Sequence, residues 1–207
     1  MESNNSKDKH LDLGCGQKPK NPYKSKILYG IDVEKIKLSK LDRENILEIK
    51  QANLIFDPIP FEDSFFDSVS AYDFIEHIPR ITSYQTGGKN LTKYSFIDLM
   101  NEIHRVLRHQ GKFYASTPVY PDASVFIDPT HVNYITDKTH YYFCLPSLGA
   151  SMYGFKGKFR VIRVIKIRPK YLYEPQQLTL KERLRKINDK FRKLESHLIW
   201  ELEAIKY

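Results

Sequence analysis

The sequence is short of cysteine and has no long apolar run. Cys15 and Cys144 are the only two cysteines among 207 residues, too few for a disulfide framework or a zinc–cysteine site, which favours a reducing compartment. No stretch approaches the roughly 20 apolar residues of a membrane-spanning helix, and residues 1–10 lack the apolar core of a signal peptide. We therefore predict a cytoplasmic protein without a transmembrane segment.

Metal-ligand spacing is also missing. The seven histidines are scattered along the chain and do not form the short His/Cys intervals of structural metal sites. The sequence therefore predicts no bound metal.

The composition is that of a folded protein with an excess of positive charge. Hydrophobic residues make up 41% and aromatic residues 13% of the chain, the net charge is +8 and the pI is about 9.3. A chain of this length buries about 70% of its unfolded surface and needs no covalent staple. The basic balance favours an anionic partner: nucleic acid, phosphorylated glycan or lipid headgroups.

Apolar patterns predict strands that alternate with helices. This order is typical of an α/β fold with a mostly parallel sheet and helices on both faces. The predicted strands cover residues 10–13, 27–33, 66–72, 112–116 and 159–167, and the predicted helices cover residues 38–49 and 94–107.

A heptad pattern marks the end of the chain. It predicts a long amphipathic helix and divides the chain into a domain over 1–170 and a helical appendage over 171–207. The apolar stripe must be buried, against its own domain, in a homodimer or on a membrane surface, and we predict a homodimer. The stripe consists of Leu180, Leu184, Ile187, Phe191, Leu194 and Leu198.

A glycine turn follows the first strand. Gly14 and Gly16 would let the backbone approach a ligand closely, and the turn predicts a helix after it. Asp32 ends the next strand, where one carboxylate can accept hydrogen bonds from a pair of ribose hydroxyls. The alternatives are an ordinary strand–helix turn and, for Asp32, a cap or turn residue. Pro19 occupies the third glycine position of a dinucleotide fingerprint, which argues against an oxidoreductase.

Four stretches together resemble the class I S-adenosylmethionine-dependent methyltransferases, in particular the type 11 domain. Residues 11–16 (LDLGCG) resemble the first motif of that family, and residues 53–61, 72–78 (YDFIEHI) and 102–111 resemble later motifs in the same order. The resemblance covers about residues 11–118. It implies a Rossmann-like sheet of seven strands with an antiparallel last strand, and S-adenosylmethionine as cofactor.

The resemblance also implies a cofactor site. Asn53 stands where the family usually has an aspartate that contacts the adenine amino group, a bond that an amide oxygen can also accept; the alternative is a plain turn former. Lys18 stands where many members have a third glycine. The residues expected to line the site are Asp12, Gly14, Gly16, Asp32, Asn53 and Leu54, with Tyr72 and Asp73 at its mouth.

The candidate catalytic residues are His131 and Asp128, in the stretch DPTHV that follows the strand at 112–116. An oxygen nucleophile needs a base of near-neutral pKa, and this stretch resembles that of some members thought to modify glycans. Asp128 as a helix cap and His131 as a packing residue are the alternatives. We predict O-methylation of a sugar, glycan or other small anionic hydroxylated acceptor. The rivals are an RNA methyltransferase and a non-catalytic, cofactor-binding partner subunit.

Overall fold

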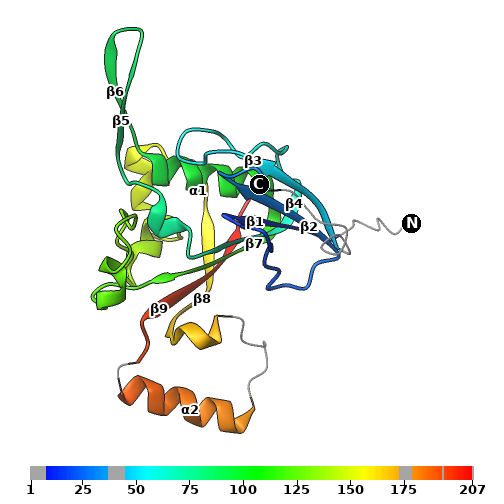
Figure 1. The fold of residues 1–207 in the computed structure, drawn as a ribbon, viewed down its shortest axis with the longest axis vertical. Coiled ribbons are helices and arrows are strands. Elements are labelled where there is room, and N and C mark those ends of the chain that lie inside the picture. Colours follow the sequence, from blue (N-terminus) through cyan, green and yellow to red (C-terminus); the bar gives the residue numbers. More distant parts are fainter. Residues whose placement is uncertain (1–7, 37–44, 173–178, 193, 207) are drawn as a thin grey trace.

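Seven strands form one mixed sheet in the computed structural model, which describes residues 8–36, 45–172, 179–192 and 194–206 (Figure 1). Their order is β3-β2-β1-β4-β7-β9-β8. Neighbours from β3 to β7 pair in parallel, and β9 is antiparallel to both of its neighbours. The antiparallel last strand is thus confirmed. The bounds are β1 (Lys9–Leu13), β2 (Ile27–Asp32), β3 (Ile46–Gln51), β4 (Phe66–Tyr72), β7 (Leu107–Pro118), β8 (Phe159–Ile167) and β9 (His197–Ala204).

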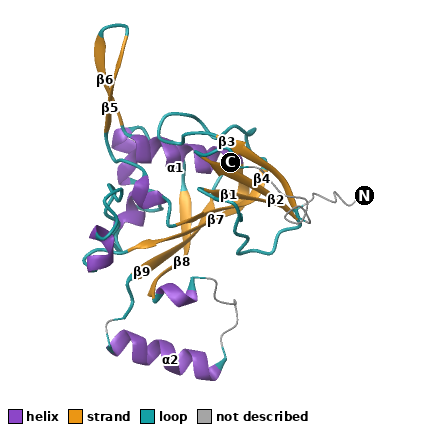
Figure 2. Ribbon diagram, viewed as in Figure 1, coloured by secondary structure: helices purple, strands orange, loops and turns teal. Residues whose placement is uncertain are grey.

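Two α-helices and several short helical turns complete the described structure (Figure 2). A two-stranded hairpin, β5 (Thr82–Thr86) and β6 (Lys89–Lys93), projects away from the sheet in Figure 1. The α-helices are α1 (Ser95–Val106) and α2 (Leu180–Phe191). The 3-10 helices are η2 (Ile75–His77), η3 (Ala123–Phe126), η4 (Thr139–Tyr142), η5 (Gly149–Tyr153) and η6 (Pro169–Tyr171).

Helix α1 covers one face of the sheet, as its apolar spacing predicts. Phe96, Met100 and Ile103 lie among its fully buried residues and join the main core. The helix ends at Val106, where the chain continues directly into β7, so the helix predicted over residues 94–107 is confirmed to within one residue at each end.

The opposite face carries a second, smaller cluster. Successive side chains of a strand point to opposite faces, so Tyr114 leaves the main core while its neighbours Phe113 and Ala115 join it. Residues from η6 and the segment before β2 cover this cluster. Its buried members are Tyr72, Tyr114, Ile167, Leu172 and Ile199.

The helix predicted over residues 38–49 is wrong where it can be compared. Residues 46–51 form β3, which pairs in parallel with β2 at one edge of the sheet. The apolar residues of this segment, Ile46, Leu47 and Ile49, are too few to separate a helical period from a strand period, and pairing with β2 selects the strand. The rest of the predicted helix, 38–44, lies outside the described residues.

The helical appendage predicted over 171–207 is wrong in its last part. Residues 197–204 form β9, and the sheet therefore extends well beyond residue 170. Leu198 ended the apparent heptad pattern, yet it also begins a period of two that is continued by Trp200 and Leu202, both fully buried. Long-range pairing with β7 and β8 decided between the two periods. The strand at 159–167 is consequently β8, not the last strand.

The apolar stripe of α2 faces solvent. The exposed fractions of Leu180, Leu184, Ile187 and Phe191 are 75%, 60%, 54% and 83%. The helix docks through its opposite side, where the buried Asp189 accepts a hydrogen bond from Arg168 Nη1 at 3.1 Å. Of the three alternatives for burying the stripe, docking on its own domain therefore does not hold for these four residues. Among the described residues no helix combines the length and apolarity of a membrane span.

Candidate active site

The glycine turn leaves the end of β1 with both glycines in the left-handed region. Gly14 has a φ of 63° and Gly16 a φ of 53°, which strongly favours glycine. A Cβ atom on Gly14 would clash with the ring of Phe74, which follows β4. The first motif therefore needs glycine both for its backbone conformation and for this close approach.

The helix predicted after the glycine turn does not form. Residues 17–26 contain turns and extended chain, because Pro19 and Pro22 lack the N–H groups that helices need. Asn21 also turns the chain locally, since its Oδ1 accepts the Ser25 N–H and its Nδ2 donates to the Ser25 carbonyl, both at 2.9 Å. No helix N-terminus therefore faces the turn.

Asp32 ends β2 beside the glycine turn. Its Oδ2 accepts the Gly16 N–H at 2.8 Å and its Oδ1 accepts the Glu34 N–H at 2.9 Å. A carboxylate has about four lone-pair sites, so about two remain for a pair of hydroxyl groups. The carboxylate both shapes the turn and keeps the capacity that a ribose needs.

Asp12 is buried behind the same turn. Its Oδ2 accepts the Lys20 N–H at 2.7 Å and its Oδ1 accepts the Ser70 hydroxyl at 2.5 Å. Burial raises the pKa of Asp12 to about 7, against these hydrogen bonds, which lower it. Asp12 thus ties the segment after the glycine turn to β1 and β4.

His10 supports Asp12 from within the core, and no sequence motif pointed to it. The Ser70 hydroxyl donates to Asp12, so it accepts from His10 Nε2–H at 2.8 Å, and Ser68 donates to His10 Nδ1 at 2.7 Å. Burial lowers the pKa of His10 to about 3. The histidine is therefore neutral and fixed in one tautomer.

Asn53 and Leu54 begin the segment after β3. Asn53 Oδ1 accepts the Ile55 N–H at 3.1 Å, and the Asn53 N–H donates to Asp57 Oδ2 at 3.0 Å. Leu54 is buried in the main core. The turn-forming alternative for Asn53 is present in the structure, and its contact with adenine stays a prediction.

Tyr72 and Asp73 end β4 in different surroundings. The Tyr72 ring packs 5.2 Å from the Tyr114 ring in the second cluster, so it is buried and does not lie at an open mouth. Asp73 is exposed with a φ of 46°, and its Oδ1 lies 3.5 Å from His197 Nε2. Of the two predicted mouth residues, Asp73 is the one that solvent and ligands can reach.

Asp128 and His131 lie in the loop after β7, at the same edge of the sheet. Asp128 Oδ1 accepts both the N–H and the hydroxyl of Thr130, at 2.8 and 2.6 Å, and these bonds hold the pKa of Asp128 below its usual value. His131 Nδ1 donates to the Val125 carbonyl at 3.0 Å. His131 Nε2 therefore carries the lone pair, 3.9 Å from Asp128 Oδ2.

Glu76 on η2 is the site residue that sequence reasoning left aside. Its side chain is 1% exposed, and neither carboxylate oxygen has a well-formed hydrogen bond. Burial, the largest cause, and the charges of Asp73 and Asp128 raise its pKa to about 8, while weak hydrogen bonds from its own N–H and from the Thr117 side chain act in the opposite direction. Only the family-like stretch YDFIEHI could have drawn attention to it.

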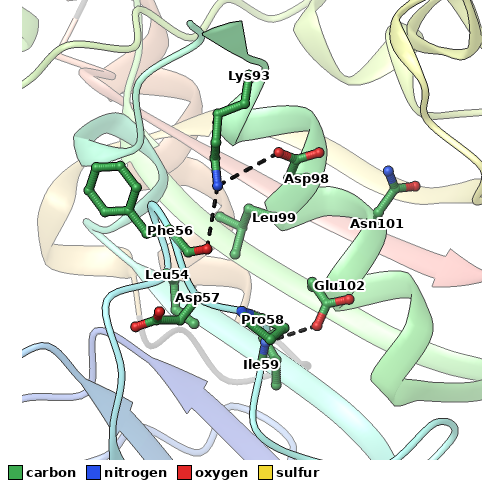
Figure 3. A pocket seen from close by; sticks show the side chains of 10 residues that line it. All are labelled: Leu54, Phe56, Asp57, Pro58, Ile59, Lys93, Asp98, Leu99, Asn101 and Glu102. Atoms are coloured by element: carbon green, nitrogen blue, oxygen red, sulfur yellow. Dashed lines mark hydrogen bonds and ion pairs between the residues drawn. The ribbon is translucent and has the colours of Figure 1, made fainter. Parts of the chain in front are cut away.

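A separate hollow of about 280 Å³ lies between residues 54–59 and α1 (Figure 3). Its polar groups bind one another: Lys93 Nζ lies 3.5 Å from the Phe56 carbonyl and 3.9 Å from Asp98, and the Ile59 N–H donates to Glu102 at 2.8 Å. Of the predicted site residues, Leu54 lines it. The hollow lies between α1 and this loop, and no residue of the glycine turn lines it.

The chain belongs to a methyltransferase family. The family Methyltransf_11, described as a methyltransferase domain, matches residues 11–115, which span the glycine turn, η2 and α1. The chain is therefore an S-adenosylmethionine-dependent methyltransferase, and the resemblance of its motifs is confirmed. A search of curated proteins found no significant match.

Solved structures share the fold at low identity. An S-adenosylmethionine-dependent methyltransferase from Aquifex aeolicus is 14% identical, with 96% of this chain and 82% of that chain covered and a TM-score of 0.57. One from Archaeoglobus fulgidus is 15% identical, with 95% and 86% covered and a TM-score of 0.52. The [4+2]-cyclase SpnF is 15% identical, with 97% and 75% covered and a TM-score of 0.57.

The residues at the glycine turn fit S-adenosylmethionine. The two left-handed glycines leave the backbone on either side of the buried Cys15 open to a ligand, and Asp32 retains acceptor capacity for two hydroxyls. The buried Asp12 holds the following segment in place. Which atoms each residue contacts stays a prediction for all eight expected cofactor residues.

Proposed function

We propose that this methyltransferase methylates a hydroxyl oxygen of a sugar, glycan or other small anionic acceptor. The observation that carries the proposal is the fixed tautomer of His131, whose Nδ1–H is held by the Val125 carbonyl. This leaves Nε2 as a proton acceptor at the edge of the sheet that carries the glycine turn. Oxygen acceptors need such a base, whereas the sulfonium donor needs no activation.

His131 is the proposed base and Asp128 its companion. The acceptor hydroxyl gives its proton to His131 Nε2, and the nearby Asp128 carboxylate stabilises the imidazolium that forms. Bound S-adenosylmethionine supplies a methyl group activated by its sulfonium. The chain contributes the rest by holding the hydroxyl in line and excluding water.

Exposed apolar side chains surround this loop and support an acceptor site there. Phe126 and Tyr134 pack with ring centroids 5.0 Å apart, and both are exposed, as are Ile127 and Val132. Such surfaces stack well on the apolar faces of sugar rings and other small acceptors. The net charge of +8 supports an acceptor that is anionic.

The experiment is to incubate the purified protein with S-adenosylmethionine that carries a labelled methyl group and with fractionated cell extract, and to identify the labelled product. We expect an ether-linked methyl group on a small molecule or glycan. Label on a nitrogen, carbon or sulfur atom would overturn the proposal.

Helix α2 supports a second candidate, methylation of RNA. Its exposed cations could neutralise phosphates. Transfer to RNA that falls steeply with salt would favour this candidate over the first. The exposed cations are Lys181, Arg183, Arg185, Lys190 and Arg192.

The apolar stripe of α2 supports the homodimer. Its four exposed side chains form one face of the helix, opposite the side that docks through Asp189. Pairing with the same stripe of a second copy would bury both faces at once.

A further inference from the structure

Three potential ligand groups converge where the loop after β7 meets η2. Ligand atoms of Glu76, His77 and His131 lie within 4.8 Å of one another. The two imidazole rings are 4.8 Å apart between centroids and meet edge to face at 71°. This cluster joins two segments that are far apart in the sequence.

Backbone hydrogen bonds fix the loop against η2. The N–H groups of Val132 and Asn133 both donate to the Glu76 carbonyl at 2.9 Å. Asn133 Nδ2 donates to the Ile75 carbonyl at 3.1 Å, and Arg80 Nε donates to Asn133 Oδ1 at 2.8 Å. The side chains of the cluster therefore rest on a held scaffold.

Both His77 and His131 use their Nδ1–H groups to donate a hydrogen bond to another part of the protein. His131 Nδ1–H donates to the Val125 carbonyl. The Thr130 hydroxyl donates to Asp128 at 2.6 Å, so it accepts from His77 Nδ1–H at 2.9 Å. Each Nε2 atom keeps its lone pair. This is the arrangement of metal-ligating histidines, whose other N–H is bound to a backbone or side-chain acceptor.

Glu76 gives a second, independent indication of a ligand. Its carboxylate is almost fully buried and has no well-formed hydrogen bond, a costly state unless a charge or donor arrives. We propose that Glu76, His77 and His131 bind one divalent transition-metal ion whose open positions hold the acceptor hydroxyl.

The donor set selects the class of metal. Two imidazole nitrogens and one carboxylate suit Zn²⁺, Fe²⁺ or Co²⁺, whereas Mg²⁺ and Ca²⁺ prefer oxygen ligands throughout. Three protein ligands with open positions are typical of catalytic sites. Ligand atoms of a tetrahedral zinc site lie about 3.3 Å apart, so binding draws these side chains together by at most about 1.5 Å.

The inference rests on the proposed function and deepens it. A bound cation lowers the pKa of a hydroxyl that it holds, so the hydroxyl proton can leave to solvent water, and His131 holds the ion in place of taking that proton itself. The expectation of no metal relied on spacing along the chain, which cannot reveal a cluster that folding assembles.

The test is a Co²⁺ titration of the full chain without an affinity tag, followed by its visible absorption. We expect one Co²⁺ per chain, displaced by Zn²⁺, and a higher Tm with Zn²⁺. His77→Ala and His131→Ala should each weaken binding by more than the about 10–100-fold that loss of an outer-shell partner costs. His109→Ala, at an exposed histidine on β7, is the matched control and should bind as the wild type does.

Glu76→Gln keeps the volume of the buried side chain and guards against misfolding of the alanine variants. It should bind S-adenosylhomocysteine normally and lose Co²⁺. No uptake by the wild type, or equal uptake by all variants, would overturn the proposal. The titration needs no acceptor, so its failure leaves methyl transfer standing, and absent O-methylation with intact Co²⁺ binding removes only the proposed function.

Discussion

The two halves of the functional edge differ in how completely their polar groups are paired. In the cofactor half, at the ends of β1 and β2, both oxygens of Asp12 and of Asp32 accept hydrogen bonds from the protein. In the acceptor half, on η2 and the loop after β7, Glu76 has no well-formed hydrogen bond and each histidine keeps one ring nitrogen without a proton. The cofactor half is held in place by its own hydrogen bonds, whereas the acceptor half has side chains that can still bind a ligand.

This difference teaches where specificity lies. The cofactor half, whose carboxylates accept hydrogen bonds mostly from the backbone, binds the cofactor that the whole family shares. Side chains on η2 and the loop after β7 that lack hydrogen bonds destabilise the fold. Binding of a particular acceptor, or of an ion that holds it, can offset this loss.

The largest expected effect breaks the acceptor half. His131→Ala should lower turnover by about 10²–10⁴-fold, because it removes the group that takes the acceptor proton or, with a metal ion bound, a ligand of that ion, and should leave the affinity for S-adenosylmethionine nearly unchanged. Steady-state kinetics against the acceptor found by labelling will measure this. Full activity would return His131 to a packing role.

The next effect breaks the cofactor half. Asp32→Ala removes hydrogen bonds to a charged acceptor, each worth about 1.5–3 kcal/mol, so the Kd for S-adenosylhomocysteine should rise by at least about 10-fold. Calorimetry measures it, and Asp128→Ala, in the other half, is the control. Equal losses in both variants would mean that the two halves are not separate.

A smaller effect concerns the support beneath the cofactor half. The pKa of His10 is about 3 when folded and 6.5 in a model peptide, so the unfolded chain binds an extra proton between these values. The free energy of unfolding should therefore fall as the pH is lowered from about 6.5 towards 3. Urea unfolding at several pH values measures the slope. His10→Gln should flatten it, whereas an unchanged slope would exclude His10 as its source.

The smallest effect on stability lies outside the edge. Leu184→Glu combined with Ile187→Glu changes exposed positions of α2, so the free energy of unfolding should change by less than about 0.5 kcal/mol per site. If the stripe pairs two copies, the variant should be a monomer where the wild type is a dimer. Light scattering decides this, with Arg185→Glu as the charge-matched control. A wild-type monomer removes the homodimer.

Local motifs made the cofactor half predictable. The left-handed glycines, the buried Asp12 and the strand-end Asp32 all lie within 32 residues of the chain start, and their types follow from backbone conformation and hydrogen bonding. Helix α1 was predictable for the same reason, since its apolar spacing is unambiguous.

What the sequence could not predict depends on pairing between distant segments. Leu198 fits a heptad helical pattern and also a strand period of two. Only the pairing of residues 197–204 with both β7 and β8 selects the strand. The apolar residues of β3 likewise fit either a helix or a strand. No regular spacing along the sequence predicts the cluster of Glu76, His77 and His131, because hydrogen bonds between the loop after β7 and η2 bring the three residues together.

The most direct measurement is calorimetric titration of the wild type and of His131→Ala with S-adenosylhomocysteine. We expect one site per chain in both proteins and nearly equal Kd values, because the cofactor half is complete without the acceptor half. No heat of binding in the wild type at high ligand concentration would contradict the cofactor site itself.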